Sequence, residues 1–380
     1  MSAQNIFSQQ QVNNVTQSAG GYSIECHGPL VMDYDASRNY LTDPRKVRKL
    51  WKGPDSYVSF GPYRSRVMIR GSETGVPVCY LKGGPGSAPV SSAQKRYWQP
   101  DSMRIALSSW RGCGDSTPLG GTEQNTTNDL LEDVETMRRM MGVEAMVLAG
   151  YCWGGTVAFK YAERYPERVL GAAIMLPYLA REIDVEQGFG PTGIAKKYPG
   201  AYEEFCTWTG STNPRDIFSK YAAALNQDLR SREAVEAYTR WVNWEYASSG
   251  EDTRLDAASI NPDSKQELWA IAGERINVSY LSQGYFLPSD GVTQNLHAVN
   301  SLAEQGKPIL YISNELDPLM APDHLQTLQK NLPAANSMII RGADWHWTSP
   351  KSVGKSNALV ENGLAFMVQR AVYQIQRMAL

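Results

Sequence analysis

Residues 145–154 of the chain read AMVLAGYCWG. The apolar run Ala145–Ala149 predicts a buried strand, and the helical spacing within Thr156–Tyr165 predicts a helix soon after it. The turn between them has the pattern G-x-C-x-G around Cys152. A sharp strand-to-helix turn needs glycine on both sides because its central residue is strained. Such a turn would hold the Cys152 thiol out at the top of a sheet, so Cys152 is a candidate nucleophile.

Strands and helices alternate on both sides of this turn. Short apolar runs predict further strands at Pro77–Leu81, Arg104–Ser108, Val169–Leu176, Lys307–Ile312 and Ser337–Arg341. Apolar residues at helical spacing predict helices over Asn128–Met141 and over residues 360–375. This alternation predicts an α/β fold with a mostly parallel sheet.

Residues 181–300 interrupt the alternation. They mix aromatic with charged residues and contain no clear strand, which predicts a helical cap. The cap is inserted before the strand Lys307–Ile312, which is expected to carry the catalytic acid. The first residues are rich in Gln, Asn and Ser and are expected to be mobile. The expected domains are a partly mobile N-terminal extension (1–55), a core (56–180 and 301–380) and the helical cap (181–300).

Composition excludes some classes of function. The 380 residues include 37 Lys and Arg against 39 Asp and Glu, a net charge of −2. A protein that binds nucleic acid electrostatically needs a basic face, so no nucleic-acid partner is expected. No apolar run reaches the roughly 18 residues of a membrane span, and the polar start lacks a signal-peptide core. We therefore expect a cytoplasmic protein without a membrane partner.

The cysteines and histidines do not predict a metal site. The five cysteines include no C-x-x-C pair, and the four histidines show neither H-x-x-x-H nor H-E-x-x-H spacing. The Gly-Gly-Pro-Gly stretch of residues 83–86 lacks the G-x-G-x-x-G pattern and contains a proline, which argues against nucleotide binding. No cofactor is expected.

An acid and a histidine follow Cys152 at the ends of later strands. Asp317 comes just after Lys307–Ile312, and His346 comes just after Ser337–Arg341. The order nucleophile, acid, histidine is that of the α/β-hydrolases. Cys152, His346 and Asp317 are the expected catalytic triad, with Glu315 and Asp344 as competing candidates for the acid.

Further motifs extend this pattern along the chain. They are Lys82-Gly83-Gly84-Pro85-Gly86, the stretch WRGCGDSTP at 110–118, Asn125-Thr126-Thr127, and Trp241-x-x-Trp244-Glu245. With the turn at 150–154 they resemble motifs of the proline iminopeptidases, over about residues 75–375. The resemblance implies an α/β-hydrolase core with a helical cap. It also implies hydrolysis of a small-molecule or short-peptide substrate through an acyl-enzyme.

The resemblance assigns further residues to the site. It implies an oxyanion hole formed by the backbone amides of Trp153 and of Gly84 or Gly83. Glu245 matches a cap glutamate that holds the free amino end of the substrate. The second such glutamate is replaced here by Asn277, and Glu274 lies on the wrong side of the match to substitute for it with confidence. The remaining expected substrate-binding residues are Lys82, Trp244 and Tyr151.

Three departures from the family matter for chemistry. Cys152 stands in place of serine, and a thioester partitions toward amines more readily than an oxygen ester does. Lys82 replaces the histidine of the oxyanion loop, either as a solvated lysine or as a cation near the site. Ser109-Trp110 replaces Asp-Gln, which changes the floor of the pocket.

The sequence leaves three functions open. The first is a proline-iminopeptidase-like hydrolase acting on a small amide or peptide, ester or thioester through an acyl-cysteine. The second is an acyltransferase or thioesterase-like enzyme of a specialised-metabolite pathway. The third is an inactive relative that binds a small ligand under the cap. The oligomeric state is open in all three.

Overall fold

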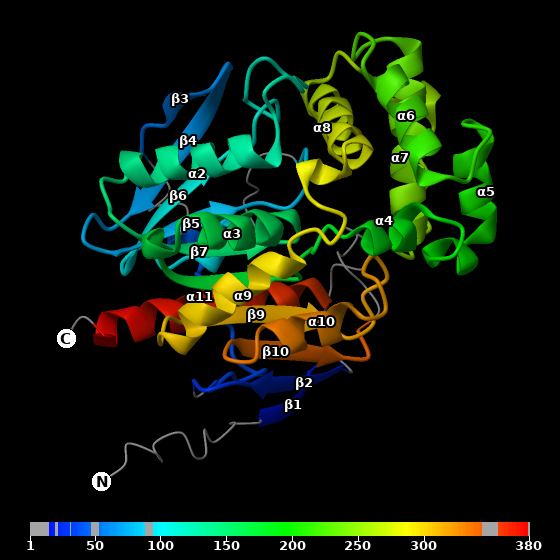
Figure 1. The fold of residues 1–380 in the computed structure, drawn as a ribbon. Helices are drawn as coiled ribbons and strands as arrows, with labels where there is room; N and C mark the ends of the chain where they lie inside the picture. Colours follow the sequence, from blue (N-terminus) through cyan, green and yellow to red (C-terminus); the bar gives the residue numbers. More distant parts are fainter. Residues whose placement is uncertain are drawn as a thin grey trace.

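The computed structural model of the chain describes residues 15–19, 22–30, 32–46, 53–87, 94–343 and 356–378. Within these residues ten strands form one sheet in the order β1-β2-β10-β9-β8-β7-β5-β6-β4-β3 (Figure 1). The strands are β1 (Val15–Ala19), β2 (Tyr22–His27), β3 (Ser56–Phe60), β4 (Tyr63–Gly71), β5 (Val76–Leu81), β6 (Met103–Ser108), β7 (Met146–Tyr151), β8 (Val169–Met175), β9 (Ile309–Asn314) and β10 (Asn336–Arg341).

The centre of the sheet is parallel. Strands β6, β5, β7, β8, β9 and β10 pair in parallel, and antiparallel strands extend the sheet at both edges. The carboxyl ends of the parallel strands therefore meet at one edge, where open α/β sheets carry their ligand sites. The α/β fold expected from the sequence is confirmed.

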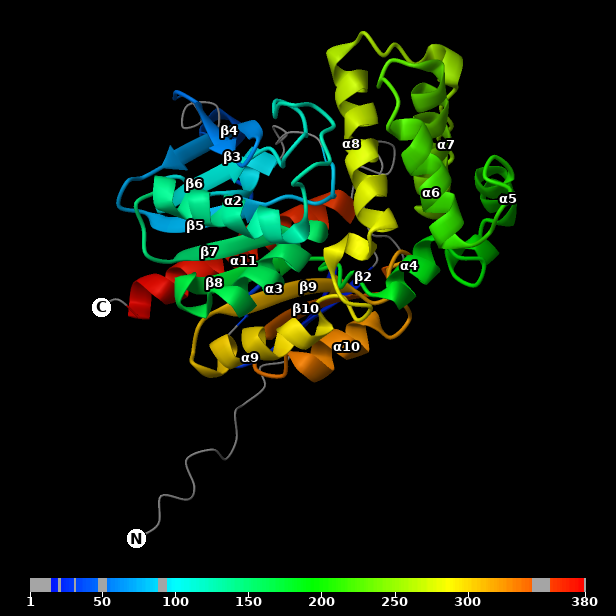
Figure 2. The same ribbon diagram turned by 45° about the horizontal axis from the view of Figure 1, so that its top comes forward.

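Helices cover both faces of the sheet (Figure 2). One face carries α2 (Thr127–Met140), α3 (Trp153–Arg164), α9 (Leu296–Glu304) and α10 (His324–Asn331), and the other carries α11 (Ser356–Met378). Each face has its own apolar core: Val157 of α3 lies in the first, and Leu364 of α11 in the second. Thr126 and Asp129 form a capping box at the start of α2, which fixes where that helix begins.

Between β8 and β9 the chain forms a helical region to one side of the sheet (Figure 1). We call this region the cap. It consists of α4 (Glu182–Phe189), α5 (Pro199–Thr207), α6 (Pro214–Leu225), α7 (Arg232–Ser248) and α8 (Lys265–Ser282). Residue 300, the expected end of the cap, lies inside α9, which packs against α3 of the core. Six short 3-10 helices connect the described elements: η1 (Gln94–Tyr97), η2 (Pro166–Arg168), η3 (Ile194–Lys196), η4 (Ala257–Ser259), η5 (Gly284–Phe286) and η6 (Thr293–Asn295).

The two ends of the cap lie side by side. The Val292 amide donates to the Leu179 carbonyl at 2.9 Å, and the Glu182 amide donates to the Ser289 carbonyl at 2.8 Å. The chain thus leaves the core and returns to it through one pair of hydrogen-bonded segments.

The N-terminal region differs from the expected extension. Strand β2 pairs with β10 in antiparallel register, with Cys26 opposite Met338. Ile24 and Cys26 are buried in the core of the α11 face. Residues 22–27 therefore belong to the sheet, because β2 pairs with both β1 and β10 and its alternate side chains join the core.

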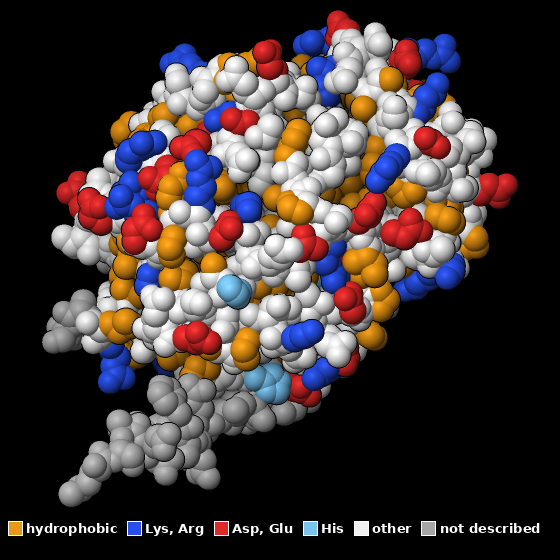
Figure 3. Space-filling view, in the orientation of Figure 1, with side chains coloured by type: hydrophobic (Ala, Val, Ile, Leu, Met, Phe, Trp, Pro, Cys, Tyr) orange, Lys and Arg blue, Asp and Glu red, His pale blue; other side chains and the backbone are white. Residues whose placement is uncertain are grey.

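The surface carries both signs of charge. In Figure 3 basic and acidic side chains are interspersed on the visible face, in keeping with 37 basic and 39 acidic residues in the chain. Among the described helices, none is both long enough and apolar enough for a membrane crossing.

Candidate active site

Cys152 occupies the turn between β7 and α3. Its backbone has φ +50° and ψ −116°, a conformation that costs a non-glycine residue about 1–3 kcal/mol. Two hydrogen bonds hold the turn: the Cys152 amide donates to the Met175 carbonyl at 3.0 Å, and the Gly155 amide donates to the Cys152 carbonyl at 2.8 Å. The thiol is partly exposed, as a nucleophile requires.

The glycine after Cys152 is required by a close backbone approach. A Cβ at Gly154 would lie 2.0 Å from the Leu81 carbonyl oxygen at the end of β5. No side chain fits there, so the start of α3 can contact the end of β5 only with glycine at this position. This contact brings the segment after β5 next to Cys152.

That segment is Lys82–Ser87, which the resemblance predicts to be the oxyanion loop. A Cβ at Gly83 would lie 3.0 Å from the Tyr151 ring, and one at Gly86 would lie 2.0 Å from the Gly273 carbonyl oxygen on α8. The loop is therefore enclosed between the turn that holds Cys152 and the cap.

Two backbone amides beside Cys152 are available to a ligand. Within the described part of the chain, neither the Gly84 amide nor the Trp153 amide donates a hydrogen bond. Unpaired N–H groups in a loop and at a helix start are suited to stabilise a developing oxyanion.

Lys82 is buried beneath the oxyanion loop. Its ammonium donates to the Ser87 carbonyl at 3.3 Å, and its side chain is only 2% exposed. Burial lowers the pKa of Lys82 to about 8, and a charge on the neighbouring Cys113 opposes this shift. The alternative of a solvated loop lysine is therefore wrong.

Asp317 follows β9 at the same edge of the sheet as Cys152. Its carboxylate accepts from the Leu319 amide at 3.1 Å. Burial raises the pKa of Tyr151 well above its usual range, and charges on Cys152 and Asp317 raise it further. Tyr151 is thus close to both groups.

The competing acid, Glu315, is already engaged. It pairs with Arg341 at 2.8 Å and accepts from the Gly342 amide at 2.9 Å. These contacts give Glu315 a structural role beside β10, which favours Asp317 as the acid. His346 and Asp344 lie outside the described residues.

A pocket of about 360 Å³ opens beside Asp317. Gln187 of α4 lines it and donates from its side-chain amide to the Pro318 carbonyl at 3.0 Å. The cap therefore contacts the loop that carries the acid.

Two carboxylates face each other between α7 and α8. The side-chain amide of Asn277 donates to Glu245 Oε1 at 3.2 Å and to Glu274 Oε2 at 2.9 Å. The Trp241 indole also donates to Glu245, at 2.9 Å. The structure thus brings together Glu245 and Asn277, and adds Glu274. The sequence signal that could have identified Glu274 is its spacing from Asn277. Residues 274 and 277 are three apart in a helix and share a face.

Both carboxyl groups hold their protons more tightly than usual. Burial raises the pKa of Glu245 well above its ordinary value, and a charge on Glu274 raises it further. Burial raises the pKa of Glu274 to about 7, opposed by its hydrogen bond from Asn277. Two acids at one desolvated place favour a cation there, because a bound cation would restore both charges.

Aromatic residues connect this pair with Cys152. Trp153 stacks on Tyr285 with ring centroids 5.2 Å apart, and the Tyr285 hydroxyl donates to the Tyr178 hydroxyl at 3.3 Å. Burial raises the pKa of Tyr285, and charges on both Cys152 and Glu245 raise it further. Tyr285 therefore lies near both Cys152 and Glu245.

Trp244 is placed elsewhere. It is 2% exposed, donates from its indole to the Gly188 carbonyl at 3.1 Å and stacks on Phe205. Its ring holds α7 against α4 and α5, so the structure does not bring it together with the other expected site residues.

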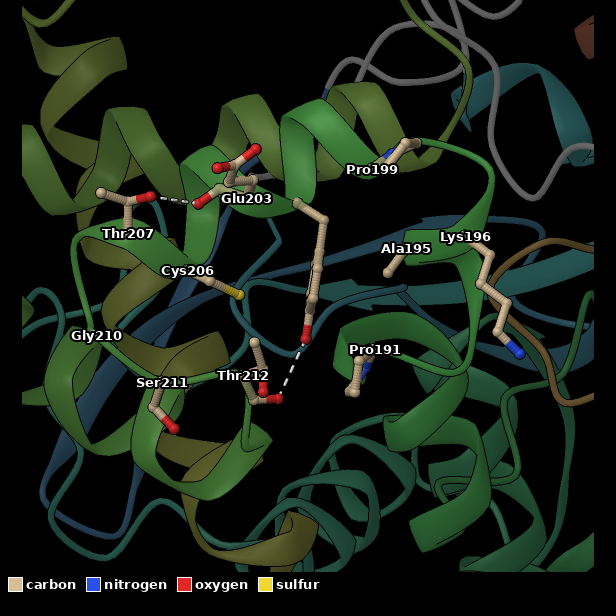
Figure 4. Close-up of a pocket in the computed structure, with 11 residues that line it drawn as sticks. Pro191, Ala195, Lys196, Pro199, Glu203, Cys206, Thr207, Gly210, Ser211 and Thr212 are labelled. Atoms are coloured by element: carbon tan, nitrogen blue, oxygen red, sulfur yellow. Dashed lines mark hydrogen bonds between the residues drawn. The ribbon is translucent and has the colours of Figure 1, made fainter.

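A larger pocket of about 820 Å³ lies in the cap (Figure 4). Tyr202 lines it and donates from its hydroxyl to the Thr212 carbonyl at 3.2 Å. None of its lining residues is among the expected site residues, and burial raises the pKa of its one thiol, Cys206. Among the described residues, no group of three or more His, Cys, Asp or Glu side chains is arranged to hold a metal ion.

The strained turn, the loop with a free amide and the acid after β9 all lie at one edge of a parallel sheet. This arrangement is that of the α/β-hydrolases. The sequence profile of the alpha/beta hydrolase fold matches residues 76–347, and the chain belongs to that family.

Within the family, the chain is similar to proline iminopeptidases. It is 28% identical to that of Neisseria meningitidis serogroup A over 273 residues, which cover 71% of this chain and 83% of the relative. It is 32% identical to that of Arabidopsis thaliana over 222 residues, covering 58% of this chain and 57% of the relative.

Solved structures share the fold. VinJ superposes with a TM-score of 0.50 at 17% identity, over 77% of this chain and 92% of VinJ. The proline iminopeptidase of Mycobacterium smegmatis has a TM-score of 0.49 at 17% identity, over 86% of this chain and all of its own.

Proposed function

We propose that the protein is a proline-iminopeptidase-like hydrolase that forms an acyl-cysteine on Cys152. Its substrate is a small molecule or short peptide with a free amino group beside the scissile carbonyl. The carboxylate pair Glu245 and Glu274, hydrogen-bonded through Asn277, carries this proposal. A substrate ammonium would bind there while the carbonyl reaches Cys152 past Tyr285.

The proposed reaction has two steps. His346 takes the proton of the Cys152 thiol as the sulfur attacks the carbonyl carbon, and the carbonyl electron pair moves to oxygen, where the Gly84 and Trp153 amides would stabilise it. The electron pair returns, the C–N bond breaks, the amine leaves with the proton from His346, and a thioester remains. His346 then takes a proton from water, the hydroxide attacks the thioester carbonyl, the C–S bond breaks, and His346 returns the proton to the sulfur. Asp317 would orient His346.

Glu274 supplies a second carboxyl group although the position that matches the second family glutamate is Asn277. Glu274 lies one turn earlier on α8, and its carboxyl group reaches the Asn277 side chain. Asn277 then holds the two acids in position as the shared donor.

The test is turnover of a fluorogenic N-terminal proline amide by the wild-type protein. Activity that disappears in Cys152→Ala, and that falls when the substrate nitrogen is acetylated, supports the proposal. A folded wild-type protein that cleaves the free and the acetylated amide equally contradicts the role of the carboxylate pair.

The sulfur nucleophile favours a second candidate, acyl transfer or thioester cleavage. A thiolate is a better leaving group than an alkoxide, so an acyl-cysteine passes readily to an amine acceptor. An amide product that forms from a thioester donor only when an amine is added would support this reaction. Ligand binding without covalent capture at Cys152 would instead indicate an inactive relative.

A further inference from the structure

The carbonyl group of Gly83 is held by two side chains. The Trp110 indole donates to this oxygen at 3.3 Å from a buried position, and the Ser87 hydroxyl donates to it at 2.5 Å. Trp110 lies just after β6 and Ser87 at the end of the oxyanion loop, so the contacts come from two separate segments.

These contacts determine where the next amide points. The Gly83–Gly84 peptide is trans, and in a trans peptide the carbonyl and the following N–H point in opposite directions. Fixing the Gly83 oxygen therefore fixes the Gly84 N–H, which has no acceptor among the residues described. Glycine at 84, with φ +124°, would otherwise leave this peptide free to rotate.

The same contacts strengthen the donor. A peptide whose carbonyl accepts hydrogen bonds is polarised, and its N–H becomes a better donor in turn. A buried indole and a hydroxyl on one oxygen thus improve both the direction and the strength of the Gly84 amide.

We propose that Trp110 and Ser87 are positioning residues that aim the Gly84 amide at the oxyanion formed during acylation of Cys152. This inference rests on the proposed acyl-cysteine chemistry.

Two reagents separate this role from general damage. With p-nitrophenyl acetate, the Cys152 sulfur attacks the carbonyl carbon, an oxyanion forms, and p-nitrophenolate leaves. With iodoacetamide, the same sulfur displaces iodide from a methylene carbon and no oxyanion forms. Only the first reaction needs the Gly84 amide.

The experiment compares Trp110→Phe and Ser87→Ala with the wild type, and uses Trp110→Gln as the conservative variant. Each loss of a donor should slow Cys152 acetylation about 5- to 10-fold and leave alkylation unchanged, and Trp110→Gln should recover part of the lost rate. Melting temperatures report whether each variant is folded. If Trp110→Phe does not fold, Ser87→Ala and Trp110→Gln give the same comparison.

The outcomes are distinct. Equal slowing of both reactions, or slowing of neither, overturns the positioning role while leaving the acyl-cysteine intact. If neither reagent modifies Cys152 in the wild type, the proposed function fails and this inference fails with it.

Discussion

At the scale of single residues, Cys152 shows a conflict between stability and reactivity. Its left-handed backbone is acceptable to glycine and strained for any residue with a Cβ. We predict that Cys152→Gly is more stable than Cys152→Ala by about 1 kcal/mol. This difference is the free energy of the relieved backbone strain, reduced by the entropy that glycine adds to the unfolded chain. Urea unfolding of the two variants measures this difference. Equal stabilities would mean that the turn is not strained.

Burial of the Glu274 carboxyl group makes the stability of the protein depend on pH. Burial raises its pKa from 4.5 to about 7, so above pH 4.5 the unfolded chain releases a proton that the folded protein retains. The free energy of unfolding therefore falls as the pH rises from 4.5 toward 7, because the folded protein must either retain the Glu274 proton or bury the charged carboxylate. We predict that Glu274→Gln raises the melting temperature at pH 8 and changes it little at pH 5.

Glu274→Gln should also raise the KM for a free-amine substrate while leaving that for an acetylated substrate unchanged. Burial raises the pKa of both Tyr238 and Glu245, and a charge on Glu274 raises both further, so this variant should also lower these two pKa values. Glu233→Gln, on an exposed part of α7, is the matched control and should alter neither property. A Glu274→Gln protein that is no more stable at pH 8 than the wild type would contradict the raised pKa.

At the scale of elements, helix α8 is placed by a contact between two glycines. A Cβ on Gly273 would lie 2.4 Å from the Gly86 carbonyl oxygen, so alanine must push α8 away from the oxyanion loop. We predict that Gly273→Ala destabilises the protein by about 1–3 kcal/mol and lowers kcat/KM.

Gly200→Ala supplies the matched control. Gly200 lies in α5, and nothing lies within 4 Å of its added Cβ. Because alanine favours a helix over glycine by about 0.5–1 kcal/mol, this variant should be stabilised. Both variants are measured by urea unfolding, and a stabilised Gly273→Ala would show that α8 does not depend on this contact.

The sequence predicts elements well where apolar runs are long and bounded by turns. β7 and β8 differ from the predicted Ala145–Ala149 and Val169–Leu176 by at most two residues at either end. β2 was not predicted because its YSIECH sequence has only two fully buried positions and gains its role by pairing with β10, far along the chain. The role of Glu274 was not predicted for a different reason. A linear match assigns one position only, whereas a helix face also offers residues one turn away.

At the scale of the whole molecule, a partly buried ion network joins the cap to the core. Arg181 pairs with Asp184, whose side chain is fully buried, and with Asp323 beside α10, at 2.8 and 2.9 Å. We predict that Arg181→Met lowers the free energy of unfolding by about 3–5 kcal/mol, because it leaves the Asp184 carboxylate buried without its partner.

The control for this prediction is an exposed ion pair that joins α4 and α6 of the cap. Arg215 and Glu182 are 86% and 68% exposed, so Arg215→Met should cost about 0–1 kcal/mol. Chemical unfolding measures both. Similar small losses in the two variants would mean that the Arg181 network does not hold the cap in place.

The hydrogen-bonded ends of the cap have a consequence for how such a protein changes its substrate. Because Leu179 and Val292 adjoin, everything between them can be exchanged as one contiguous cassette without altering the spacing of the core strands. A single genetic exchange would then replace Glu245 and Glu274 together and leave Cys152, its turn and Asp317 untouched. Under the proposed function, selectivity and reactivity are thus encoded in separable stretches of the same chain.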